Sequence, residues 1–110
     1  MLSPGLYLAQ RLSALIMAPL VLGHLAVMIM AIQGGLDSAE ILSRTQGSVF
    51  WGMFYQLFVI AVSIHAAIGV RVVAAEWFAF KAAALVSITW LVALLLFVLG
   101  TYAVSAVVLT

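Results

Sequence analysis

Residues 63–71 read SIHAAIGVR, and they lie near the end of an apolar run that covers about residues 50–75. A run of about 20 apolar residues is long enough to cross the ~30 Å hydrocarbon core of a bilayer as an α-helix. Polar side chains inside such a helix are costly and usually have a function. The run therefore predicts a membrane span, with His65 and Arg71 as candidate functional residues.

The composition indicates the same class of protein. The chain has 110 residues, of which 68% are hydrophobic and 6% charged, and its mean hydropathy is +1.38. A soluble domain of this length has too little interior to bury so much apolar surface, so we expect an integral membrane protein. A net charge of +1 gives no reason to expect a nucleic-acid partner. The absence of cysteine excludes disulfides, thiolate zinc sites and cysteine-ligated iron–sulfur clusters within this chain.

Three apolar runs predict an all-α fold with one transmembrane domain over residues 1–110. The expected membrane spans are about residues 6–32, 50–75 and 82–102. The first run is too long for the apolar region of a signal peptide, and no charged region precedes it. We therefore expect it to remain in the mature protein as a membrane span.

Local signals predict how these helices begin and bend. Pro4 suits the first turn of a helix, and Pro19 is expected to kink the first span. Asp37 with Glu40 resembles a capping box, which predicts a short interfacial helix over residues 38–45.

The positive charges predict the orientation. With three spans, the N-terminus and the turn between the second and third spans share one side of the membrane. That side carries Arg11, Arg71 and Lys81, whereas the other side carries Arg44 alone. The positive-inside rule then places the N-terminus in the cytoplasm, for a multi-pass protein of a bacterial inner membrane, or in the matrix.

His65 is the first candidate ligand. It lies eleven residues before Glu76, roughly 16 Å from the end of its helix. A neutral imidazole at that depth is favourable only when both nitrogens have partners, such as a metal and a hydrogen-bonding group. Gly69 lies one turn away on the same face and leaves room for a flat macrocycle, which makes His65 a candidate haem ligand. The alternative is a histidine bonded to another helix, with Gly69 as a packing notch, and the spacing fits both.

Two arginines are candidates for binding polar groups near the surface. Arg71 is six residues beyond His65, roughly 9 Å nearer the surface, where the propionates of such a haem would emerge. Arg11 is expected at the same level of the first span, where it could bind a propionate or a quinone carbonyl, and Ser13 is a nearby hydrogen-bonding group. Either arginine could instead extend towards lipid headgroups.

His24 is the second histidine inside the membrane. It lies thirteen residues past Arg11, roughly 20 Å along the helix, which places it on the order of 10 Å deeper than His65. One haem needs both axial ligands at nearly the same depth, so these two histidines are not expected to share a haem. His24 either ligates a second haem or is structural. A bis-histidine site at His65 would need a partner subunit or a second copy of the chain.

The order and spacing of these residues resemble a known family. His65-x-x-x-Gly69-x-Arg71, followed by Glu76, resembles the second helix of the membrane-anchor cytochrome b subunits of succinate dehydrogenase and fumarate reductase. Residues 11–14 resemble their first-helix motif Arg-x-Ser-Gly, with alanine in place of the glycine. Length, number of spans and expected orientation also agree, so the resemblance covers essentially the whole chain.

The resemblance implies a fold and a set of partners. Two three-helix anchor subunits form a bundle with haem b between them, so this chain would be one half, completed by a second membrane-anchor subunit. A flavoprotein subunit and an iron–sulfur subunit dock on the cytoplasmic or matrix face. Electrons then pass between succinate and quinone in the membrane lipid. The chain itself would be a non-catalytic anchor that takes part in electron transport.

The resemblance also implies roles for single residues. His65 would be the axial ligand of haem b, beside Gly69, and Arg71 would lie on the propionate side. Arg11 would lie at the quinone pocket or the propionates, with Ser13 as a further quinone contact. His24 resembles the first-helix histidine of the two-haem members.

Two positions depart from the family pattern. Tyr7 replaces a serine that often precedes the first-helix arginine by four residues, and Val72 replaces a histidine that often follows Gly-x-Arg. The spacing from Arg11 to His24 is also about a turn shorter than in the two-haem members.

Two alternatives remain open at this stage. The first is a haem-free anchor of a fumarate reductase-type complex, in which His65 is structural. The second is a small proton-coupled transporter, which usually needs an acidic residue deep in a span. The three acidic residues fall in loops or at helix ends, which argues against a transporter: Asp37, Glu40 and Glu76.

Overall fold

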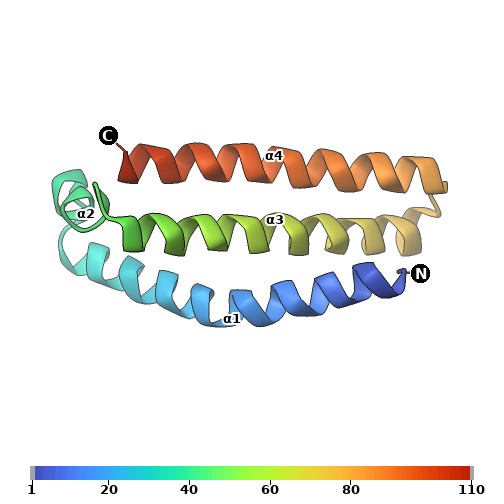
Figure 1. Ribbon diagram of the computed structural model, residues 1–110, viewed down its shortest axis with the longest axis horizontal. Helices are drawn as coiled ribbons and strands as arrows, with labels where there is room; N and C mark the ends of the chain where they lie inside the picture. Colours follow the sequence, from blue (N-terminus) through green and yellow to red (C-terminus); the bar gives the residue numbers. More distant parts are fainter. Residues whose placement is uncertain (1, 110) are drawn as a thin grey trace.

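The computed structural model describes residues 2–109, which form four helices (Figure 1). They are α1 (Pro4–Gln33), α2 (Ser38–Thr45), α3 (Val49–Phe78) and α4 (Ala82–Val108). Three of them, α1, α3 and α4, are long and apolar enough to cross a membrane. The expected all-α fold with three membrane-spanning helices is therefore confirmed. The helices reach beyond the predicted spans, most of all α4, which continues to Val108 because the chain stays apolar there.

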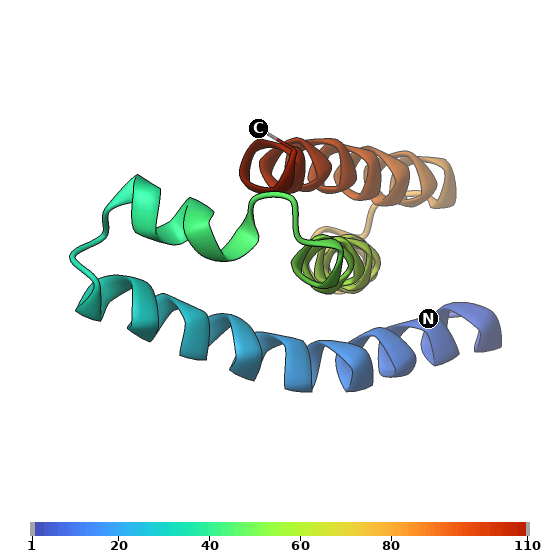
Figure 2. The same cartoon turned by 60° about the vertical axis from the view of Figure 1, so that its left-hand side comes forward.

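The three long helices lie antiparallel, with α3 packed against both α1 and α4 (Figures 1 and 2). The N-terminus and the α3–α4 turn lie at one end of the molecule (Figure 1). The C-terminus and α2 lie at the other end, where α2 crosses from α1 towards α4 (Figure 2). The central position of α3 means that its side chains face both neighbours, and it contains most of the buried residues.

The helix ends follow local chemistry. Ser3 caps α1, because its hydroxyl oxygen accepts a hydrogen bond from the Leu6 amide at 3.2 Å. Pro19 lies inside α1, and the helix bows in its middle as expected (Figure 1). Ala79 ends α3 in the left-handed conformation, with φ of +51°. The spans predicted from the sequence leave residues 76–81 for the turn. The turn between α3 and α4 is shorter, because α3 continues through Phe78.

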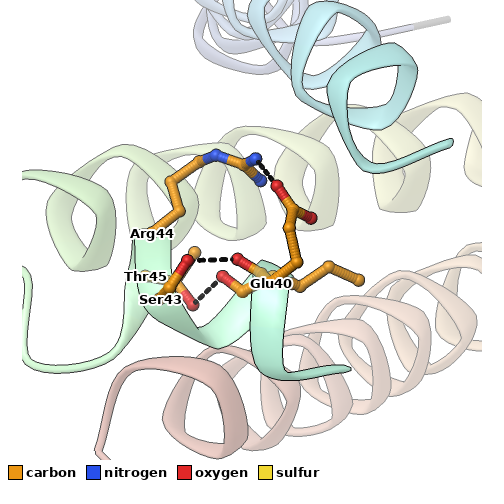
Figure 3. Close-up of polar contacts among 5 residues, drawn as sticks. Glu40, Ser43, Arg44 and Thr45 are labelled. Carbon is orange, nitrogen blue, oxygen red and sulfur yellow. Dashed lines mark hydrogen bonds and ion pairs between the residues drawn. The ribbon is translucent and has the colours of Figure 1, made fainter. Parts of the chain in front are cut away.

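The short helix α2 occupies the predicted residues, but only half of the predicted capping box forms. The Asp37 carboxylate accepts a hydrogen bond from the Ala39 amide at 3.3 Å, which caps the helix. Glu40 does not return to the cap and instead forms an ion pair with Arg44 one turn later (Figure 3). A nearby cation offers the carboxylate a charged partner, which is a stronger hydrogen-bond donor than a neutral amide.

Two hydrogen bonds tie α2 to the end of α4. The Thr45 hydroxyl donates to the Val107 carbonyl at 2.8 Å, and the Gly47 amide donates to the Val108 carbonyl at 2.7 Å. Thr45 is almost fully buried as a result. These bonds satisfy carbonyls that the last turn of α4 would otherwise leave unpaired.

Small residues bring the long helices together. A Cβ atom added at Gly100 of α4 would lie 2.6 Å from a Val59 methyl group of α3. A Cβ atom added at Gly23 of α1 would lie 2.9 Å from the Phe54 ring. Membrane helices associate through such close contacts, because lipid chains are as apolar as the side chains themselves. Most large apolar side chains therefore remain on the outside, and α4 has no fully buried residue over its whole length.

Candidate functional site

His65 and Ser13 meet where α3 crosses α1. The His65 Nδ1 atom lies 3.4 Å from the Ser13 hydroxyl oxygen, within hydrogen-bonding distance. The same hydroxyl donates to the Gln10 carbonyl at 3.0 Å. Ser13 is only 4% exposed, so this contact is shielded from solvent. His65 therefore has a hydrogen-bonding group on another helix, as one of the two alternatives from the sequence required. That group is the hydroxyl of Ser13 in the same chain.

His65 also borders an open apolar groove. The groove has a volume of about 590 Å³ and is lined by residues of α3, the α3–α4 turn and α4: His65, Ala66, Gly69, Val70, Val73, Ala74, Phe78, Phe80 and Ile88. A Cβ atom added at Gly69 would meet no atom of another residue closer than the Gln10 amide nitrogen at 3.8 Å. Gly69 is therefore not needed for close helix packing, unlike Gly100. Its missing side chain instead widens the groove beside His65.

Arg71 lies in a different cavity. It lines a pocket of about 780 Å³ at the end of the molecule that holds the N-terminus, together with Tyr7 and Glu76. Six residues of an α-helix turn by roughly 240°, so Arg71 points to another side of α3 than His65. The structure thus brings His65 and Gly69 into one groove and places Arg71 in a neighbouring pocket.

Arg11 and Ser13 are close in sequence but face different surroundings. Two residues of a helix are roughly 200° apart, so Ser13 is buried against α3 while Arg11 is exposed. Arg11 donates a hydrogen bond to the Tyr7 hydroxyl at 3.2 Å, and its guanidinium carbon lies 5.7 Å from the Tyr7 ring centre. The pair places a cation on the outer surface of α1 near the N-terminal end.

His24 is packed among aromatic rings. Its ring centre lies 5.9 Å from that of Tyr55 and 5.4 Å from that of Phe58. The His24 Nδ1 atom is buried and has no hydrogen-bond partner among residues 2–109. His24 lines a smaller, open apolar pocket of about 300 Å³, which Gly100 also borders.

The two histidines lie at different depths. His65 is opposite Ser13, and His24 is eleven residues further along α1, a distance of roughly 16 Å. This separation is in the direction expected from the sequence, with His24 further than His65 from the end that holds the N-terminus.

Sequence reasoning missed two polar side chains inside the bundle, Gln10 and Gln56. The Gln10 side-chain oxygen is buried without a hydrogen-bond partner among residues 2–109, and its amide lies near Gly69. Its position three residues before Ser13 places both on one helix face, which is the signal that could have found it. The Gln56 amide donates to the Thr101 hydroxyl at 3.1 Å and joins α3 to α4.

His65 offers a metal ion a single side-chain ligand, the imidazole. Within residues 2–109, no group of three or more histidine, aspartate or glutamate side chains is placed to hold a metal ion. A single imidazole beside an apolar groove is instead the arrangement that haem proteins use for an axial ligand.

Three antiparallel apolar helices, with polar residues buried between α1 and α3, define an integral membrane subunit of the helical-bundle type. The chain belongs to the succinate dehydrogenase/fumarate reductase transmembrane subunit family, whose model matches residues 4–109. Membership implies association with other subunits of such a complex. Comparisons with curated proteins and with solved structures gave no match.

Proposed function

We propose that this chain is the haem b-containing membrane-anchor subunit of a succinate:quinone oxidoreductase. In this role it helps to bind quinone and to pass electrons between the iron–sulfur subunit and the quinone pool. The observation that carries the proposal is the environment of His65, which lies within hydrogen-bonding distance of the Ser13 hydroxyl and borders an open apolar groove.

The groove suits a haem in chemistry and shape. Its lining is almost wholly apolar, as the faces of a porphyrin require, and Gly69 keeps the space beside His65 clear. His65 would supply one axial ligand, and the second would come from the partner anchor subunit. When bound, haem b supplies one-electron transfer near the quinone.

The pocket around Arg71 suits the polar groups of a quinone or of the haem. The Arg71 guanidinium and the Tyr7 hydroxyl are hydrogen-bond donors for a quinone carbonyl or a propionate. Arg11 lies on the exposed side of α1, so its guanidinium is available to a group that a neighbouring subunit presents. His24 does not belong to this haem site, because it lies roughly 16 Å further along the bundle than His65.

The charges support an orientation with the N-terminus in the cytoplasm of a bacterium. Arg11, Arg71 and Lys81 lie towards the end with the N-terminus, whereas Arg44 at the opposite end is paired with Glu40. The iron–sulfur and flavoprotein subunits would then dock at the N-terminal end, close to the Arg71 pocket.

The test is the reduced-minus-oxidised absorption spectrum of the complex purified with its partner subunits. We expect a b-type haem band in the wild type and its loss in His65→Ala, because the axial ligand is removed. His24→Ala is the control, and the haem at His65 should remain in it. A wild-type complex without a b-type band would establish the haem-free alternative, and an unchanged band in His65→Ala would refute His65 as the ligand.

A further inference from the structure

We infer that Ser13 is the positioning residue of His65, because its hydroxyl fixes which imidazole nitrogen is free to bind iron. The inference deepens the proposed haem site and rests on it. It concerns only groups of this chain: the Ser13 hydroxyl, the Gln10 carbonyl and the His65 ring.

The Ser13 hydroxyl has one proton to donate and two lone pairs with which to accept hydrogen bonds. The Gln10 carbonyl can only accept, and it lies 3.0 Å from the Ser13 hydroxyl oxygen, so the single proton is directed there. The contact with Gln10 is also shorter than the 3.4 Å contact with His65, so we assign the hydroxyl as the acceptor towards His65 and the proton in that contact to Nδ1.

This assignment leaves Nε2 as the free nitrogen. A neutral imidazole carries one N–H group, so a proton on Nδ1 leaves a lone pair on Nε2. Only a nitrogen with a lone pair can coordinate a metal, and the hydrogen bond at the other nitrogen sets which one this is. His65 also lines the apolar groove, so the tautomer with a free Nε2 is the one that would allow this nitrogen to bind a metal there.

The geometry of α1 makes the selection stable. Ser13 is 4% exposed, so water does not compete for its hydroxyl. Its acceptor, the Gln10 carbonyl, belongs to the same helix three residues earlier, so the direction of the proton does not depend on another subunit. In this way α1 determines the tautomer of a residue on α3.

The hydroxyl should also influence the iron electronically. A group that accepts the Nδ1 proton raises the basicity of the ligating nitrogen and stabilises the ferric state. A neutral hydroxyl at 3.4 Å does so weakly compared with a carboxylate. Loss of this acceptor should therefore raise the midpoint potential of the haem and weaken haem binding.

The experiment compares three variants of the purified complex. Ser13→Ala removes the acceptor, and Ser13→Thr keeps a hydroxyl at the same position. Ser63→Ala is the matched control, because Ser63 is also 4% exposed and lies two residues from His65, but its hydroxyl donates to the Val59 carbonyl at 2.7 Å. The readouts are the haem content per complex, the midpoint potential and the electron paramagnetic resonance spectrum of the ferric haem.

We expect Ser13→Ala to raise the midpoint potential, shift the ferric signal and lower haem affinity by up to about tenfold, the lower end of the range for groups that hold a metal ligand. Ser13→Thr should restore values close to wild type, and Ser63→Ala should leave them unchanged. Haem in the wild type together with an unaltered potential in Ser13→Ala would overturn this inference alone. Equal changes in Ser63→Ala, or loss of haem in Ser13→Thr as well, would also overturn it. A wild-type complex without haem would instead refute the proposed function.

Discussion

The two histidines of this chain lie in opposite kinds of surroundings. His65 has a hydrogen-bonding partner in Ser13 and borders an open apolar groove. His24 is packed against two aromatic rings and borders a smaller apolar pocket, and its Nδ1 atom has no partner among residues 2–109. The difference shows that depth in the membrane does not by itself identify a ligand. A ligand also needs one occupied nitrogen and free space at the other.

A glycine borders each of these two spaces, but the two glycines have different roles. Gly69 beside His65 has no close neighbour in the position of a side chain, whereas Gly100 near His24 is in tight contact with Val59. One glycine therefore keeps a groove open, and the other lets two helices approach. Substitutions at these positions test whether the contrast is real.

The largest effect is expected at Gly69. Gly69→Leu should fill the groove beside His65 and abolish the b-type band, while the helical content measured by circular dichroism stays the same. Gly69→Ala is the control, because the added Cβ atom would be 3.8 Å from its nearest neighbour, an ordinary contact. A full b-type band in Gly69→Leu would mean that the groove is not the haem site.

A smaller effect, on stability, is expected at Gly100. Gly100→Leu should destabilise the chain by about 3 kcal/mol, because overpacking a tight contact forces the helices apart. The added Cβ atom would lie 2.6 Å from a Val59 methyl group, so Val59→Ala in the same chain should restore part of the loss. Thermal denaturation of the purified complex in detergent measures both variants. Equal stability of Gly100→Leu and the wild type would contradict the packing described for α3 and α4.

The smallest effect is expected at His24. His24→Phe should raise stability by about 1 kcal/mol, since it removes a buried nitrogen without a partner and keeps the contacts with the aromatic rings. The number of haems per complex should not change if His24 is structural. A fall to half of the wild-type number would assign a second haem to His24 and remove the contrast between the two histidines.

Most of the fold could be predicted from the sequence, because its determinants are local. Hydropathy indicated the three spans, and the cap at Asp37 indicated α2. The helix α4 continues past the span expected for it, since residues 103–108 are still mainly apolar and neither proline nor a charged residue follows Lys81. The partner of Glu40 was also missed, because an ion pair with Arg44 and a cap are both compatible with the same spacing.

The candidate site was predictable only in part. His65 and Gly69 share a face through their spacing on one helix, and the structure keeps them together. The contact of His65 with Ser13 depends on how α1 is rotated against α3, which a sequence does not specify. The spacing along the helix gave the distance of Arg71 from His65 along the axis. It did not show that the two residues border different pockets.

The length of the helices has a consequence for how the chain sits in a bilayer. The molecule is 48 Å long, whereas the hydrocarbon core is only ~30 Å thick. The short helix α2 lies across one end and is polar on its surface, so it marks the level of the lipid headgroups there. The helix ends around the N-terminus and the α3–α4 turn therefore extend past the hydrocarbon core into the opposite headgroup layer, since a bilayer with its headgroups is ~40–45 Å thick. The exposed rings of Trp77 and Phe78 at this end suit that layer, so a water-soluble protein that docks here would meet the helix ends among the lipid headgroups.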